Sequence, residues 1–264
     1  MKLYKKKILN VNVGKCLLVS LITFVIRYFY ANVYLGFHNS LVTITEGVRS
    51  QIYFGGILID HSFDLISLSF FAILFILEIC YLTMDLFNDA NDNMVILLPR
   101  YGKKHIIYKD ILIKMILRDC IVVVSDYLFF LFVEHTSNGL EDFKVIFMLL
   151  IEIFHLQMIS YLFSFWKDSI IGYIVAFIVF FIPVMVCGFY FSMGNVIWKI
   201  WHYSLLHIPL FNWHNKLIIY YVEENYEWTT SNLLNFKSSC LISVISSAVL
   251  VWIGKFLCEK KQIL

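Results

Sequence analysis

Five ionisable side chains stand inside stretches of the sequence that are otherwise apolar: Arg27, Glu78, Arg118, Asp126 and Glu152. A charge in the hydrocarbon core of a bilayer costs about 2.5–3.5 kcal/mol on insertion scales, so such residues usually face protein or water and pair with one another. Their chemistry is ion pairing. It serves either as fixed contacts between helices or as a polar pathway that rearranges during transport, and both interpretations stay open.

The depths of these residues predict two layers of pairing. With a rise of about 1.5 Å per helical residue, Arg27, Asp126 and Glu152 fall slightly to the outer side of the midplane, whereas Glu78 and Arg118 fall to the inner side. We therefore expect Arg27 to pair with Asp126 or Glu152. We expect Arg118 to pair with Glu78.

Further charges lie on the stretch that contains Arg118. Asp110, Lys114 and Arg118 recur every four residues and so form one ladder along a helix, with favourable contacts at that spacing. Asp119 and Asp126 are seven residues apart and share another face of the same helix.

A different cluster follows the second apolar stretch. The apolar run Met94–Leu98 leads into a basic segment marked by Pro and Gly. Attraction to anionic lipid is enough to explain the Lys and Arg residues of this segment. It does not explain five consecutive apolar residues flanked by polar ones. The pattern therefore predicts a short amphipathic helix that docks a partner, and the residues expected to do so are Leu97, Leu98, Pro99, Arg100, Tyr101, Gly102, Lys103 and Lys104.

Motifs of catalysis are missing from the sequence. It has no GxxxxGK[ST] phosphate loop, no HExxH zinc helix and no GxSxG nucleophile turn. His202, His207 and His214 could bind a metal, but histidines among interfacial aromatic residues explain them better. We expect no catalytic residue, no metal and no cofactor in this chain.

The elements that carry these residues follow from composition. Of 264 residues, 60% are hydrophobic and 15% charged, whereas soluble proteins have about 45–50% and about 25%. A helix needs about 20 apolar residues to cross a bilayer. The sequence predicts an all-α, polytopic membrane protein with one domain (1–264) and six spans: Cys16–Leu35, Leu65–Met84, Ile111–Val133, Val145–Phe165, Ile170–Tyr190 and Ser238–Leu257.

The connections predict the orientation and two minor features. Fifteen of the 21 Lys and Arg residues fall at the termini and in the second and fourth connections, against five in the other loops. The positive-inside rule then places both termini in the cytoplasm. Residues 166–169 predict a tight hairpin between spans four and five. Trp198, Trp201 and Tyr203, followed by Pro209, predict short interfacial helices between spans five and six.

Together, these features resemble the ABC-2 type permeases, the membrane subunits of bacterial ABC transporters. The matching features are the Lys-rich start, the six spans, the aromatic fifth loop and the short charged tail Cys258–Leu264. The most specific match is the basic run Leu97–Lys104, which is similar to the cytoplasmic coupling segment of these permeases. Small permeases for export of peptide antibiotics, or for immunity to them, are the most similar. The Lys-, Ile-, Asn- and Phe-rich composition agrees with an AT-rich, low-GC Gram-positive bacterium.

This resemblance implies a transport function in the cell membrane. A peptide, a lipid-like molecule or another amphiphile is moved with ATP and Mg²⁺ bound to a separate cytoplasmic ATPase subunit. The permease pairs with a second copy or with a sister permease, and nucleic acid is no partner. The alternative is an ATP-independent membrane protein, either a peptide immunity or sensor protein or a secondary carrier.

Overall fold

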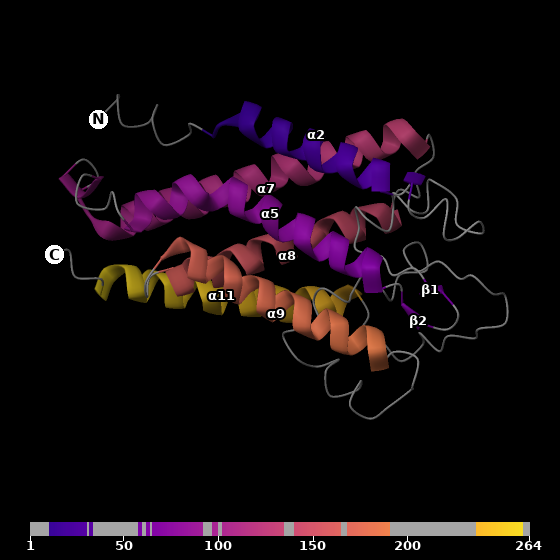
Figure 1. The fold of residues 1–264 in the computed structure, drawn as a ribbon. Helices are drawn as coiled ribbons and strands as arrows, with labels where there is room; N and C mark the ends of the chain where they lie inside the picture. Colours follow the sequence, from indigo (N-terminus) through magenta and orange to yellow (C-terminus); the bar gives the residue numbers. More distant parts are fainter. Residues whose placement is uncertain are drawn as a thin grey trace.

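Six long helices make up most of the computed structural model, which describes residues 11–30, 32–33, 58–59, 62–63, 65–91, 97–99, 102–134, 140–164, 168–190 and 236–260. The helices lie alongside one another along a common direction (Figure 1). Each overlaps one predicted apolar stretch, so the all-helical prediction is confirmed for these elements. They are α2 (Val13–Tyr30), α5 (Leu65–Asn91), α7 (Lys104–Glu134), α8 (Leu140–Ser164), α9 (Ser169–Tyr190) and α11 (Phe236–Lys260).

One small feature departs from an all-helical fold. Between α2 and α5, Leu58–Ile59 (β1) pairs antiparallel with Ser62–Phe63 (β2). Leu58 lies opposite Phe63, and Ile59 lies opposite Ser62. This two-stranded sheet has only two residues in each strand and comes shortly before α5 in the chain.

Within the part of the chain that the structure describes, four helices are long and apolar enough to cross a membrane, against six predicted spans. Their qualifying segments are Val13–Tyr30, Ser69–Asn88, Ile146–Ser164 and Cys240–Lys260. The 31-residue helix α7 is longer than any of these, but its charged residues keep it out of this group. In α9, the described apolar part is Ser169–Ile182, which is shorter than a span. These apolar helices indicate a membrane-embedded protein.

The outer helices expose apolar faces suited to lipid. On α2, Leu17, Leu21 and Phe29 are exposed, and on α11 Leu241 and Trp252 are exposed. Soluble monomers rarely expose contiguous apolar surface on this scale. Both faces are therefore expected to contact lipid tails.

Aromatic side chains fill the core between α5, α8 and α9. The Phe75 ring lies 5.3 Å from that of Phe71 and 5.4 Å from that of Phe180, measured between centroids. Phe87 lies 5.5 Å from both Tyr161 and Tyr173. This packing joins α5 to the pair formed by α8 and α9.

A glycine sets how closely α8 and α9 approach. A Cβ added at Gly172 of α9 would lie 2.1 Å from the Ser160 carbonyl oxygen of α8. Only a residue without a side chain fits there. The two helices therefore pack as closely as the predicted hairpin requires.

The connection segment (residues 97–104) is described in part. Leu97–Pro99 have helical backbone, and the Gly102 N–H donates to the Leu98 carbonyl at 2.7 Å. Gly102 has φ of 75°, the left-handed conformation that commonly ends a helix at glycine. These residues fit part of the amphipathic helix predicted after span two. Arg100 and Tyr101, and the aromatic loop between spans five and six, lie outside the described residues.

Candidate functional site

The Arg27 cluster consists of Ser20 and Arg27 on α2, Glu78 on α5 and Asp126 on α7. Arg27 is 2% exposed, and its Nη2 lies 2.9 Å from Glu78 Oε2. Its Nη1 lies 3.1 Å from Asp126 Oδ2. The Ser20 hydroxyl donates to the other oxygen of Asp126. One guanidinium therefore holds two carboxyl groups and ties three helices together.

The Arg27 cluster is incompletely satisfied. Arg27 Nε and Glu78 Oε1 are buried and have no hydrogen-bond partner. When both carboxyls are ionised, the cluster carries one more negative than positive charge. An uncompensated charge away from water is costly. Binding of a proton or a cation, or a shift of one helix, therefore changes the electrostatic energy of the cluster substantially.

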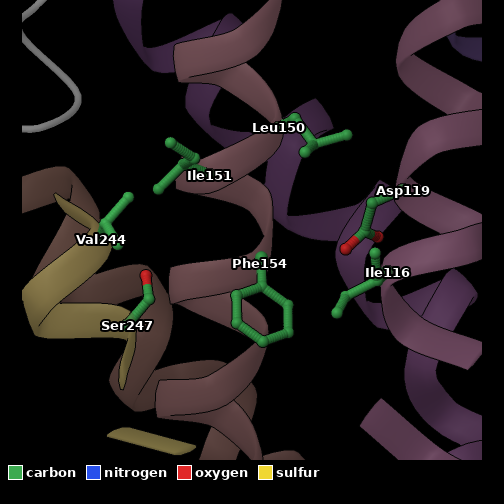
Figure 2. Close-up of a pocket in the computed structure, with 7 residues that line it drawn as sticks. All are labelled: Ile116, Asp119, Leu150, Ile151, Phe154, Val244 and Ser247. Atoms are coloured by element: carbon green, nitrogen blue, oxygen red, sulfur yellow. The ribbon is translucent and has the colours of Figure 1, made fainter. Parts of the chain in front are cut away.

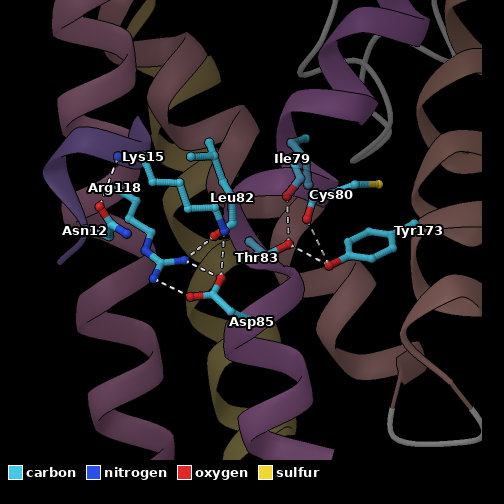
Figure 3. A network of polar contacts seen from close by, with 9 residues as sticks. All are labelled: Asn12, Lys15, Ile79, Cys80, Leu82, Thr83, Asp85, Arg118 and Tyr173. Atoms are coloured by element: carbon cyan, nitrogen blue, oxygen red, sulfur yellow. Dashed lines mark hydrogen bonds and ion pairs between the residues drawn. The ribbon is translucent and has the colours of Figure 1, made fainter. Parts of the chain in front are cut away.

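The Asp85 cluster consists of Lys15 on α2, Asp85 on α5 and Arg118 on α7 (Figure 3). Arg118 binds Asp85 through two parallel contacts, Nη1–Oδ1 and Nη2–Oδ2, each 2.7 Å long. Lys15 Nζ reaches Asp85 Oδ1 at 3.0 Å. Arg118 also donates to the Leu82 carbonyl. This cluster carries one more positive than negative charge.

A separate group of neutral hydrogen bonds near the Asp85 cluster joins α5 to α9. The Thr83 hydroxyl lies 2.7 Å from the Ile79 carbonyl and 2.9 Å from the Tyr173 hydroxyl (Figure 3). Tyr173 also reaches the Cys80 carbonyl at 3.4 Å. Helix α5 therefore makes polar contacts with α2 and α7 through Asp85 and with α9 through Thr83.

The predicted pairing is partly confirmed and partly wrong. Arg27 does contact Asp126, as expected. Arg118 pairs with Asp85 instead of Glu78, and Glu78 lies beside Arg27. The reason is the length of α5, which continues to Asn91 rather than ending at Met84, so that Asp85 belongs to the helix.

Glu152 takes no part in the Arg27 cluster, although it was the second candidate for pairing with Arg27. It is 2% exposed on α8, and its Oε1 has no hydrogen-bond partner. The physical reason is the packing order, because α2 packs against α5 and α7.

Along α7, the predicted ladder is present in part. Asp110 and Lys114 form an ion pair of 2.7 Å at the i, i+4 spacing. Asp119 is buried and accepts a hydrogen bond of 2.7 Å from Gln157 on α8. Asp119 and Asp126 both face the protein interior, as expected for residues seven apart.

The connection segment is fixed to the protein through its leucines. Leu97 and Leu98 are partly buried and pack against the core. Pro99, Gly102 and Lys103 are exposed. Lys104 begins α7, and its Nζ lies 3.4 Å from the Glu259 carbonyl of α11. The apolar residues expected to face a partner therefore anchor the segment, and among its described residues Pro99, Gly102 and Lys103 are the exposed ones.

Sequence reasoning missed Asp85, Lys15, Ser20 and Gln157 as members of the buried network. Asp85 had a usable signal, since it follows Glu78 by seven residues and so shares its helix face. The Ser20 and Gln157 contacts depend on which helices are neighbours, and no local pattern reveals that.

Within the described ranges, no group of His, Cys, Asp or Glu is arranged to hold a metal ion. The three histidines singled out in the sequence, 202, 207 and 214, lie outside those ranges. No protein-family model and no curated protein sequence matches this chain.

Proposed function

We propose that this chain is the membrane-spanning permease subunit of an ABC-type transporter. It moves a peptide, lipid-like or other amphiphilic substrate across the cell membrane, and a separate cytoplasmic subunit hydrolyses ATP. The observation that carries the proposal is the continuity of α7. One helix begins directly after the exposed Lys103 and supplies both Arg118 and Asp126 to the two ion clusters.

Helix α7 is suited to transmit a force from outside the bundle to its interior. Fourteen residues separate Lys104 from Arg118, which is about 21 Å along a helix. A force on Lys103 therefore reaches the Asp85 cluster through a rigid element. Transport requires a bistable element whose two states bind the ATPase with different affinity. The two ion clusters, with opposite excess charge, are our candidate for that element.

On this proposal all six helices cross the membrane. Helix α7 fails a simple hydropathy test, but its charges face protein: Arg118 and Asp126 form ion pairs, and Asp119 contacts Gln157. Charged residues in spanning helices are tolerated when they face the interior in this way.

The proposed orientation places Lys103 and both chain ends in the cytoplasm. Lys103, Lys104 and the end of α11 lie at one end of the bundle, because Lys104 contacts the Glu259 carbonyl. Lys237 stands near the other end of α11, about 33 Å from Glu259 at the rise of a helix. That separation matches a hydrocarbon core of about 30 Å.

The docking surface is tested by co-purification from native membranes. We expect a nucleotide-binding ATPase to accompany the wild-type chain in stoichiometric amount. The double variant Arg100→Glu/Lys103→Glu should lose most of it, because charge reversal opposes a complementary surface.

The matched control is Lys255→Glu/Lys260→Glu, which reverses two exposed charges on α11 near the same end. It should retain the ATPase. Equal recovery with both double variants refutes the docking assignment. Absence of any ATPase from the wild-type preparation refutes the proposed function and favours an ATP-independent membrane protein.

A further inference from the structure

A cavity of about 190 Å³ lies between α7, α8 and α11. Figure 2 shows its lining: Asp119 on the α7 side, Ser247 on the α11 side, and the Phe154 ring between them. Apart from these two polar residues, the walls are aliphatic or aromatic. For comparison, an apolar cavity of about 150 Å³ accepts benzene. The space therefore fits one aromatic ring or a short alkyl chain.

The mouth of the cavity faces the apolar surroundings of the bundle. Ile116 and Val244 line it and are 43% and 53% exposed. Both belong to outward surfaces of α7 and α11. A ligand therefore enters from the lipid side and can leave part of its body outside the cavity.

One carboxyl group, that of Asp119, is among the residues that line the otherwise apolar cavity. Asp119 is 0% exposed, and its Oδ2 has no hydrogen-bond partner. Its Oδ1 accepts a hydrogen bond from Gln157, a neutral group that adds no positive charge. The adjacent Arg118 is engaged by Asp85 on α5. The carboxylate thus lacks a counter-ion, and because it is buried, an unpaired charge there costs more free energy than at the surface.

The second orphan group is the Ser247 hydroxyl, which is buried and has no hydrogen-bond partner. Buried polar atoms in native proteins are nearly always satisfied, so each exception requires an explanation. Here two exceptions line one cavity. A bound molecule that supplies a donor to Asp119 Oδ2 satisfies the first of them, whereas Ser247 requires a polar partner of its own.

We propose that this cavity binds lipophilic amines, with the cationic nitrogen on Asp119 and the apolar body against Phe154. A positive nitrogen supplies the missing charge and a donor, and the ring face of Phe154 adds cation–π or stacking contact. The inference concerns binding only and does not depend on an ATPase partner.

The test is equilibrium binding of tritiated phenethylammonium to the full chain in lipid nanodiscs, with empty nanodiscs subtracted. Unlabelled phenethyl alcohol, a neutral analogue of nearly the same shape, competes. We expect the wild type to bind the ammonium at least about tenfold more tightly than the alcohol, the gain for a charged hydrogen bond. Equal affinities, or no saturable binding, overturn the proposal.

A variant of Asp119 tests whether this residue binds the ammonium group. In Asp119→Asn, which keeps the shape and an acceptor for Gln157, the preference for the ammonium should fall below about twofold, because the charged partner is gone. The control Glu259→Gln, an exposed carboxyl on α11, should leave it unchanged. A preference that survives in Asp119→Asn places the cation elsewhere and refutes the assignment.

Should Asp119→Asn fail to fold, Val244→Trp gives an independent answer. It narrows the mouth and leaves the carboxyl in place. We expect weaker binding of both the ammonium and the alcohol, and unchanged affinities would refute the cavity as the site.

Discussion

Arg27 and Arg118 hold their carboxylates in environments that differ in burial and in the number of partners. Arg27 lies wholly inside the bundle with two carboxyl partners. Arg118 shares one carboxyl, Asp85, with Lys15, and the Asp85 side chain is 51% exposed. Glu78 and Asp85 are seven residues apart on α5, about 10 Å along the helix. Two clusters of opposite excess charge therefore stand two helical turns apart.

Removing the cation of the Arg27 cluster should be costly. We expect Arg27→Gln to lower the free energy of unfolding by about 3–5 kcal/mol, because it leaves Glu78 and Asp126 buried without a counter-ion. Denaturant unfolding in micelles measures this. The triple variant Arg27→Gln/Glu78→Gln/Asp126→Asn, which removes every charge, should recover most of the loss. A triple variant less stable than the single one contradicts the ion-pair account.

In the Asp85 cluster, geometry predicts which pair is stronger. A double-mutant cycle between Arg118→Met and Asp85→Asn should give a coupling energy of about 1 kcal/mol, modest because Asp85 is half exposed. The cycle between Lys15→Met and Asp85→Asn should give less, since Lys15 makes a single contact and Arg118 makes two. The reverse order argues against the bidentate contact as the main interaction.

Sequence reasoning at the residue level identified the buried charges but not all their partners. Arg27 and Asp126 could be matched by depth because α2 and α7 lie side by side. Arg118 was matched wrongly, since hydropathy ended the second span at Met84 and treated Asp85 as part of a loop. A polar residue that is paired inside a bundle is compatible with a helix, but a local average of hydropathy cannot register its partner.

At the scale of elements, helix ends were the weak point of prediction. The first span was expected to begin at Cys16, whereas α2 begins at Val13. The Asn12 side chain accepts a hydrogen bond of 3.0 Å from the Lys15 N–H, which is typical of a capping residue. That signal is present in the sequence and places the boundary better than hydropathy does. Likewise α7 begins at Lys104 rather than Ile111.

The pair formed by α8 and α9 provides a test of helix packing. We expect Gly172→Ala to lower the free energy of unfolding by about 1–3 kcal/mol, because the new methyl group meets the Ser160 backbone of α8. Thermal unfolding of the wild type and the variant in the same detergent micelles measures this change. The control is Gly14→Ala on α2, where the nearest heavy atom is Asn12 Oδ1 at 3.7 Å.

Gly14→Ala should be neutral, or stabilising by up to about 1 kcal/mol, because alanine favours a helix. If both variants lower stability equally, the close approach of α8 and α9 is not what Gly172 provides.

For the whole molecule, the helical class and the six helices follow from apolar stretches of sufficient length. The order in which the helices pack does not. The faces of an apolar helix are so alike that the sequence does not show which neighbour each face contacts. The contacts of α2 with α5 and α7 depend on buried partners far apart in the sequence. The cavity between α7, α8 and α11 was likewise beyond sequence reasoning, because it requires three helices to be placed.

In the proposed orientation, the connection segment and the start of α11 lie on opposite sides of the membrane. The most direct measurement is cysteine accessibility, with Lys103→Cys or Lys237→Cys as the single thiol after the six native cysteines have been replaced. A membrane-impermeant maleimide should label Lys237→Cys in intact cells. It should label Lys103→Cys only after the membrane is opened. Labelling of Lys103→Cys in intact cells would contradict the proposed orientation and, with it, docking of a cytoplasmic ATPase.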